Sequence, residues 1–373
     1  MERVQLSAIL EDLHKKMVIL VGPRQSGKTW VAKRLAGEFT KSLYLNYDQI
    51  SDQKVIFEQN WLPSTELLIL DELHKMPFWK NYLKGLYDTK PDSMRVLVTG
   101  SARLDIFNHI GDSLAGRYFR HRLLPFSPAE LSQIQAPFSI HKLLTRGGFP
   151  EPFLADNDID AERWRLQYLH GLLSTDIFEF NQIQNLKAIQ LIFKLLRQRV
   201  GSPVSYQSLA EDVGVSSATV KKYIQILEAL YVIFIVTPFS NNIARSLLKE
   251  PKIYFFDTGL VNSNDGARLE NLTAVCLLKH VYGKYDYQAQ DYQLHYLRTK
   301  DGAEVDFALV KDGAIQQLIA VKSSDHSLSP SLVNFQKKNH CEAIQIVQNI
   351  RHETQKEAIK TLKAETFLNS LYL

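Results

Sequence analysis

Short apolar segments alternate with segments of helical periodicity over the first part of the chain. Four of these segments look like buried strands, 17–21, 42–48, 66–70 and 95–99, and a further strand follows at 118–124. Strands that alternate with amphipathic helices are typical of a parallel sheet with helices on both faces. The pattern therefore predicts an α/β domain over residues 1–125.

Beyond this domain the pattern becomes helical and then returns to strands. Helical periodicity prevails over residues 126–185, interrupted by a Gly-Gly-Phe-Pro turn at 147–150, and predicts a helical lid or connector. A further α/β domain is predicted over residues 261–373, where a helix at 268–282 is followed by strands at 293–298, 304–310 and 317–321.

Residues 186–260 have the pattern of a winged helix. Two short helices, 206–213 and 216–230, are joined by a glycine turn, and strands at 232–236 and 252–256 would form the wing. The second helix presents hydroxyl, lysine and glutamine side chains, which suit a DNA groove, but it has no arginine. A DNA-binding winged helix and a purely structural one both fit this pattern.

Composition narrows the class of protein. A chain of 373 residues exceeds one comfortable core, and its 45% hydrophobic and 23% charged residues are typical of globular proteins. A net charge of +4 permits contact with nucleic acid without requiring it. The two cysteines, Cys276 and Cys341, indicate neither a disulfide framework nor a zinc ribbon.

No segment approaches the ~20 apolar residues of a membrane span, and residues 1–16 lack a signal-peptide core, so we expect a cytoplasmic protein without a membrane partner.

A phosphate-binding loop follows the first predicted strand. Residues 22–29 match the pattern G-x-x-x-x-G-K-[ST] between a strand and a helix. In such a loop backbone N–H groups and the helix N-terminus face the phosphates, Lys28 reaches the β and γ oxygens, and Thr29 ligates Mg²⁺. We therefore predict ATP and Mg²⁺ as ligands. The predicted nucleotide-binding residues are Gly22, Pro23, Arg24, Gln25, Ser26, Gly27, Lys28, Thr29 and Trp30.

Two carboxylates end the strand at 66–70. Asp71 can hold Mg²⁺ through water, and Glu72 can polarise the attacking water. An Asp-Glu pair at a strand end is also common in solvated loops, but the complete phosphate loop upstream favours the functional interpretation. With Lys28, these residues predict hydrolysis of ATP.

Two further polar positions are candidates for the nucleotide site. Thr99 or Ser101, at the tip of the strand at 95–99, would sense the γ-phosphate, although Ser101 also suits a plain helix cap. Arg117 could serve as an arginine finger toward a nucleotide in its own or a neighbouring subunit, or it could be a surface arginine.

These features resemble a known architecture: bacterial and archaeal AAA-like ATPases with a winged helix and a C-terminal domain of unassigned function with a restriction-endonuclease-like fold. The resemblance covers nearly the whole chain and rests on these motifs: Gly22–Thr29, Leu70–Glu72 with Lys75 and Pro77, Thr99–Ser101, Gly147–Pro150 and Ile253–Leu260. It implies that the strand at 95–99 lies between the phosphate-loop strand and the Asp71 strand, which would bring Thr99 or Ser101 to the phosphate.

The resemblance also implies a PD-(D/E)xK nuclease-like site over Glu270, Asp306 and Lys322. Nuclease chemistry needs oxygen ligands for Mg²⁺ and a lysine near the attacking water, and Ala320 replaces the expected glutamate. Glu304 could substitute because alternate strand residues point the same way. A degenerate binding fold and an active nuclease are both left open.

The sequence as a whole predicts a Mg²⁺-dependent ATPase that couples hydrolysis to rearrangement of its winged-helix and nuclease-like domains. DNA or a protein partner would be the object of that rearrangement, and self-association is left open. Two alternatives are an ATP-dependent nuclease and a signalling scaffold that turns ATP over slowly.

Overall fold

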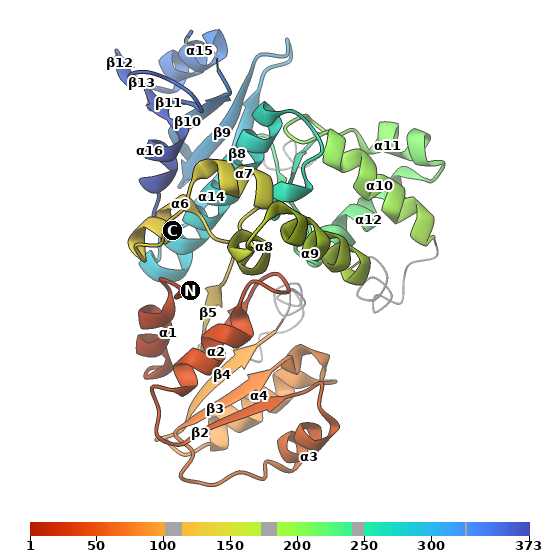
Figure 1. Cartoon of the computed structure of the whole chain (residues 1–373), viewed down its shortest axis with the longest axis vertical. Coiled ribbons are helices and arrows are strands. Elements are labelled where there is room, and N and C mark those ends of the chain that lie inside the picture. Colours follow the sequence, from red (N-terminus) through yellow and green to blue (C-terminus); the bar gives the residue numbers. More distant parts are fainter. Residues whose placement is uncertain (101–113, 173–184, 241–249, 325–326) are drawn as a thin grey trace. The chain divides into compact units, whose positions relative to one another are not determined.

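The computed structural model describes residues 1–100, 114–172, 185–240, 250–324 and 327–373. Its chain divides into two compact units: residues 1–124 with 229–231, and residues 125–228 with 232–373. Figure 1 labels most of the elements of the two units. In the part of the chain that the structure covers, no helix combines the length and the apolarity that crossing a membrane requires.

The first unit is built on a five-stranded sheet in which all neighbouring strands run parallel. Its order is β2-β3-β4-β1-β5, so β4 lies between β1 and β3, as the resemblance implied. The strands are β1 Met17–Val21, β2 Ser42–Asn46, β3 Leu67–Asp71, β4 Arg95–Thr99 and β5 Tyr118–Arg122. The helices are α1 Leu6–Leu13, α2 Lys28–Ala36, α3 Ile50–Glu58 and α4 Trp79–Thr89, with a 3-10 turn η1 at Leu73–Lys75.

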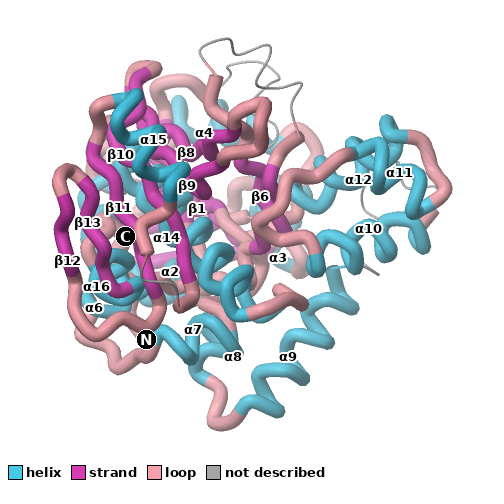
Figure 2. Tube along the Cα trace, turned by 90° about the horizontal axis from the view of Figure 1, so that it is seen from above, coloured by secondary structure: helices cyan, strands magenta, loops and turns pink. Residues whose placement is uncertain are grey.

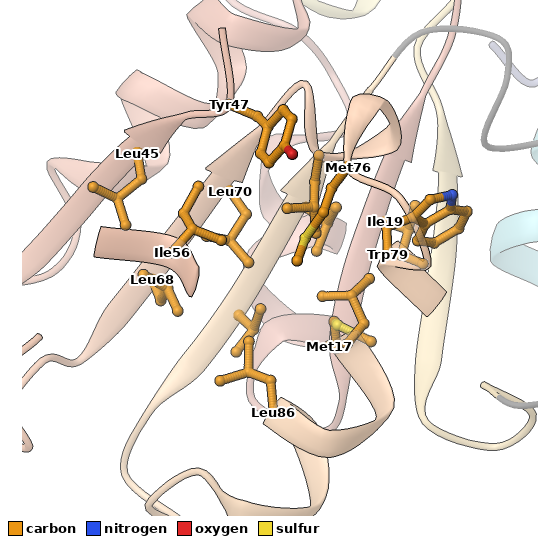
Figure 3. Close-up of a cluster of buried hydrophobic side chains, with 14 of the residues drawn as sticks. Met17, Ile19, Leu45, Tyr47, Ile56, Leu68, Leu70, Met76, Trp79 and Leu86 are labelled. Carbon is orange, nitrogen blue, oxygen red and sulfur yellow. The ribbon is translucent and has the colours of Figure 1, made fainter. Parts of the chain in front are cut away.

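Helices cover both faces of this sheet because successive strand residues point to opposite sides. On one face Met17 and Ile19 of β1 pack with Ile56 of α3 and Leu86 of α4, and Figure 3 shows these side chains converging. On the other face the intervening residues of β1 pack against α1 and α2. A strand buried on both faces must be apolar throughout, which is why β1 reads Met-Val-Ile-Leu-Val. The predicted parallel α/β domain is confirmed.

The second unit begins with short helices and a two-stranded sheet. The helices are α6 Pro128–Gln133, α7 Ile140–Arg146, α8 Pro150–Leu154, α9 Asp158–Gly171, α10 Leu186–Gln198, α11 Tyr206–Val213 and α12 Ser217–Ala229. Strands β6 Ile233–Val236 and β7 Lys252–Phe255 pair antiparallel. Figure 2 shows α10, α11 and α12 grouped together. The helices and strands thus lie where the winged-helix pattern placed them, while the assignment as a winged helix stays a prediction.

A six-stranded mixed sheet of order β12-β13-β11-β10-β9-β8 completes the second unit. Its elements are η4 Thr258–Leu260, α14 Asp265–Gln288, β8 Tyr292–Arg298, β9 Glu304–Lys311, β10 Ala314–Lys322, α15 Pro330–Asn339, β11 Glu342–Val347, β12 Thr354–Lys356, β13 Ile359–Lys363 and α16 Ala364–Asn369. The central pair β10 and β11 is parallel, whereas β8, β9 and β10 pair antiparallel. The α/β prediction for this region is confirmed, and the proposed boundaries at residues 185 and 260 stay predictions.

Side-chain caps explain where several of these helices begin. Asn157, Asn185, Ser205 and Asn264 each precede a helix, and each accepts a hydrogen bond from the backbone N–H three residues later. Such a cap satisfies one of the four free N–H groups of a helix start and contributes roughly 1 kcal/mol. The Asn264 cap starts α14 at Asp265, and this helix is longer at both ends than the predicted segment.

Candidate nucleotide site

The phosphate loop connects the carboxyl end of β1 to the start of α2. Gly22 has φ +149°, and a Cβ atom there would lie 2.2 Å from the carbonyl oxygen of Leu123. Gln25 and Gly27 are in the left-handed region, and Gly27 is the residue just before α2. The loop therefore ends directly at the N-terminus of α2, where free N–H groups and the helix dipole favour an anion.

Arg3 braces this loop from the N-terminal segment. Its guanidinium is buried and donates hydrogen bonds to the carbonyl oxygens of Ser26 at 3.0 Å and Leu124 at 2.5 Å. Both acceptors are backbone groups, so the contact depends on the positions of the two segments rather than on their side chains. The sequence held no signal for this role, because Arg3 lies outside every motif.

The predicted loop residues differ in exposure. Pro23, Ser26 and Lys28 are buried, whereas the exposed ones are Arg24, Gln25, Thr29 and Trp30. The Lys28 ammonium donates hydrogen bonds to the carbonyl oxygens of Gly22 at 3.0 Å and Pro23 at 2.7 Å. Burial lowers the pKa of Lys28 to about 8, against the opposing effect of the Glu72 and Asp71 carboxylates. The loop therefore holds a desolvated cation at the site where phosphates are expected.

Asp71 is the centre of a hydrogen-bonded group at the carboxyl edge of the sheet. Thr29 donates its hydroxyl to Asp71 Oδ2 at 2.9 Å, and the Tyr44 hydroxyl donates to the same oxygen. The Thr99 hydroxyl and the Glu72 backbone N–H both donate to Oδ1. The side-chain donors come from α2, β2 and β4, and Tyr44 and Thr99 reach Asp71 because β3 lies between β2 and β4 in the sheet. Thr99, the predicted sensor, thus contacts the predicted metal ligand directly.

Tyr44 is a site residue that the sequence analysis missed. It lies in the middle of β2, and its register partner on β3 is Ile69, two residues before Asp71. Burial and the hydrogen bond to Asp71 raise the pKa of Tyr44, so it remains a neutral donor at physiological pH. Only the sheet order shows that this strand is the neighbour of the Asp71 strand, and periodicity carries no such information.

Glu72 follows Asp71 with a backbone in the left-handed region, at φ 56°. Non-glycine residues in this region are uncommon, cost of the order of 1–3 kcal/mol and cluster at functional sites. Burial raises the pKa of Glu72, Lys28 opposes this shift, and Asp71 adds to it. His74 Nδ1 lies 3.5 Å from the Glu72 carboxylate. The carboxylate is thus partly desolvated close to the cation of the phosphate loop.

The Thr29 hydroxyl and the Asp71 carboxylate are suited to Mg²⁺. Both are hard oxygen donors, and their 2.9 Å separation places them side by side. Mg²⁺ usually keeps several waters and takes one or two protein oxygens together with substrate phosphates. This donor pair fits that preference, and Thr29 and Asp71 are the residues that would hold the ion.

Arg117 lies at the opposite edge of the sheet from the phosphate loop. Its carbonyl accepts from the N–H of Met17, at the amino end of β1, whereas the loop leaves the carboxyl end. The five residues of β1 span about 17 Å. The Arg117 side chain instead pairs with Asp88 at 2.9 Å. A finger role toward the nucleotide of its own chain is therefore wrong, and one toward a neighbouring subunit stays a prediction.

The other predicted positions lie elsewhere. Ser101 is outside the described residues. Glu270 is on α14 and Asp306 on β9, and both carboxylates approach the ammonium of Lys252, at 3.1 and 3.6 Å. Lys322 is the last residue of β10, on a strand adjacent to β9. The structure therefore brings Glu270 and Asp306 together around the ammonium of Lys252. From the sequence, Lys252 was assigned only to the predicted wing strand at 252–256.

Three family models match consecutive parts of the chain. Residues 14–132 match the model described as an AAA domain. Residues 138–271 and 265–368 match two models that are each described as a domain of unknown function. The first unit therefore has the fold of an AAA-like P-loop ATPase.

Similar proteins extend over most of the chain. An uncharacterised protein of Mycobacterium tuberculosis is 26% identical over 342 residues, covering 86% of this chain and 74% of the relative. One from Methanocaldococcus jannaschii is 24% identical over 345 residues, covering 82% and 74%. Among solved structures, the Walker-type ATPase of Pyrococcus abyssi is 14% identical, with a TM-score of 0.45 and coverage of 70% and 94%. The ORC1 protein of Aeropyrum pernix, solved in complex with DNA, is 12% identical, with a TM-score of 0.37 and coverage of 75% and 94%.

Proposed function

We propose that this chain hydrolyses ATP with Mg²⁺ and uses the turnover to rearrange its C-terminal region, which acts on DNA or on a protein partner. The observation that carries the proposal is the group around Asp71, in which Thr29 and Thr99 bind one carboxylate beside Lys28 and Glu72. For ATP binding alone, the phosphate loop is the required element. Hydrolysis requires in addition a positioned carboxylate, and Glu72 supplies one.

Each residue has a distinct role in this proposal. Lys28 supplies positive charge to the phosphates, and the N–H groups at the start of α2 orient them. Thr29 and Asp71 would hold Mg²⁺, and the ion would supply positive charge to the phosphoryl group that is transferred. Glu72 accepts a hydrogen bond from the attacking water, and a carboxylate with a raised pKa is a better base at neutral pH.

The test compares steady-state ATP hydrolysis by the full chain and by Glu72→Gln. We expect the variant to lose about 10²–10⁴-fold in kcat, the range for removal of a general base, while ATP binding is retained. Glu58→Gln is the matched control, because Glu58 is an exposed carboxylate at the end of α3. If Glu72→Gln turned ATP over within about threefold of the rate of the unsubstituted chain, the assignment of Glu72 as the base would be ruled out.

Coupling is tested by adding duplex DNA to the same assay. The helices α11 and α12 with β6 and β7 support the winged-helix part of the proposal, since their order is that of a helix-turn-helix followed by a wing. DNA-stimulated turnover, lost as salt is raised, would support DNA as the object. Turnover that is indifferent to DNA would direct the proposal to a protein partner, and very slow turnover would favour the signalling scaffold.

A further inference from the structure

The first residue of β7 is a lysine whose side chain is completely buried. Lys252 is 0% exposed, and its ammonium lies 2.6 Å from the Glu304 carboxylate, 3.1 Å from Glu270 and 3.6 Å from Asp306. The Tyr296 ring lies beside it, 5.4 Å from Nζ. Burial alone would lower the pKa of Lys252, but the carboxylates outweigh it and raise the pKa above its ordinary value. The ammonium is therefore a permanent charge.

The other contacts of these carboxylates also come from the chain itself. Tyr254 donates its hydroxyl to the same Glu270 oxygen at 2.7 Å. The second oxygen of Glu304 accepts from Arg298 at 3.0 Å. The second oxygen of Asp306 accepts from the Val321 backbone N–H at 2.8 Å. Each carboxylate is thus bound by at least two groups of the protein, as buried charged groups require.

A divalent ion does not fit this arrangement. An ion between the carboxylates would need oxygens at about 2.0–2.6 Å and would lie against the Lys252 ammonium, with strong repulsion between the two cations. Across the described ranges, no group of His, Cys, Asp or Glu side chains is arranged to hold a metal ion, and these three carboxylates surround the Lys252 ammonium instead. Gly201 also closes one side, since a Cβ atom there would lie 2.6 Å from Glu270 Oε2.

The strand beside Asp306 points to the same conclusion. Ala320 and Leu318 share a face of β10, and Leu318 pairs with Ala308 of β9, which shares a face with Asp306. Ala320, Leu318 and Ala308 all belong to one buried hydrophobic cluster. The position of the expected glutamate is therefore part of the apolar core, and no oxygen ligand is available there.

We propose that Lys252 is the resident cation of this cluster, which takes the place of a divalent metal and leaves the domain without nuclease chemistry. The lysine ties β7 to α14 and β9, so the three carboxylates serve as an internal anchor rather than as ligands. Because the lysine blocks the ion, its removal exposes a latent site: Lys252→Met, which keeps the apolar stem and loses the charge, binds one divalent ion.

The experiment follows Mn²⁺ binding by electron paramagnetic resonance in the nucleotide-free full chain. We expect the spectrum of the unsubstituted chain to be unchanged by Asp306→Asn, because no ion is held there. Lys252→Met is expected to bind one additional Mn²⁺, at least about 100-fold more tightly than the unsubstituted chain binds the ion at this cluster, since a repelling charge is removed. Lys252→Met combined with Asp306→Asn should lose this ion again.

Lys322→Met is the matched control, because it removes a lysine near Asp306 that is not at the centre of the cluster, and no Mn²⁺ gain is expected. The proposal is overturned if the unsubstituted chain binds Mn²⁺ at submillimolar concentration and Asp306→Asn removes it. A folded Lys252→Met that binds no Mn²⁺ also overturns it. If Lys252→Met does not fold, the comparison of the unsubstituted chain with Asp306→Asn decides, because both proteins keep Lys252.

Discussion

The pKa of Lys28 predicts how nucleotide binding changes with pH. In the nucleotide-free chain burial lowers this pKa from 10.5 to about 8, so the ammonium loses its proton above pH 8. Phosphates at the loop favour the charged form, and binding above pH 8 therefore takes up a proton. From pH 7.5 to 9.5, the apparent affinity for ATP should fall by about 25-fold. Below pH 7.5, Lys28 contributes little further change.

The same shift affects stability with the opposite sign. Between pH 8 and 10.5 the unfolded chain keeps a proton on Lys28 that the folded, nucleotide-free chain has lost. Stability rises with pH wherever the unfolded state binds more protons. The nucleotide-free first unit should therefore gain stability from Lys28 over this interval, while it loses affinity for ATP. The buried charge of Lys28 is unfavourable in the empty loop, as expected for a residue whose charge serves to bind the phosphates of ATP.

The assay is equilibrium binding of a fluorescent ATP analogue in EDTA, at constant ionic strength, between pH 7 and 10. Lys28→Arg is the control, because a guanidinium remains charged throughout this range. Its affinity can be lower, but its profile should be flat. The phosphate of the ligand titrates near pH 6 and does not contribute. A flat profile for the unsubstituted chain, or an equal fall in Lys28→Arg, would refute the reasoning.

Two substitutions test the packing around the sites. Arg165→Leu leaves the buried carboxylate of Asp257, 3.1 Å from the guanidinium, without its charged partner, and should cost about 3–5 kcal/mol in hydrogen-exchange protection of α9. Arg163→Leu, an exposed arginine on the same helix, should cost less than about 1 kcal/mol, and equal losses would contradict the assignment. Gly22→Ala places a methyl group 2.2 Å from a backbone carbonyl and should weaken ATP binding at least about tenfold, as a titration would show. Gly37→Ala, at the end of α2 with φ −71°, should bind normally, and retained binding by Gly22→Ala would contradict the predicted clash.

Local signals located the elements of the first unit well. The strands β1 and β3 are buried along their whole length and were visible as apolar runs, whereas β2 and β5 are only partly buried and carry polar residues. The bounds of all five strands were predicted within two residues. The phosphate loop was equally visible because its backbone geometry requires glycine at set positions. In the last domain the predicted strands correspond to β8, β9 and β10, whereas β11, β12 and β13 were not predicted. The three residues of β12 are exposed and carry no apolar pattern.

The sequence by itself determined the phosphate loop, the strand that ends in Asp71 and Glu72, and the α/β class, since these depend on neighbours within a few residues. Only the tertiary structure decided which strand ends meet. It brought Tyr44 and Thr99 to Asp71, carried Arg117 to the far edge of the sheet, and placed Lys252 among carboxylates from two other elements. The reason is physical: periodicity records which side of an element is buried, while contacts between distant segments follow from strand order and direction.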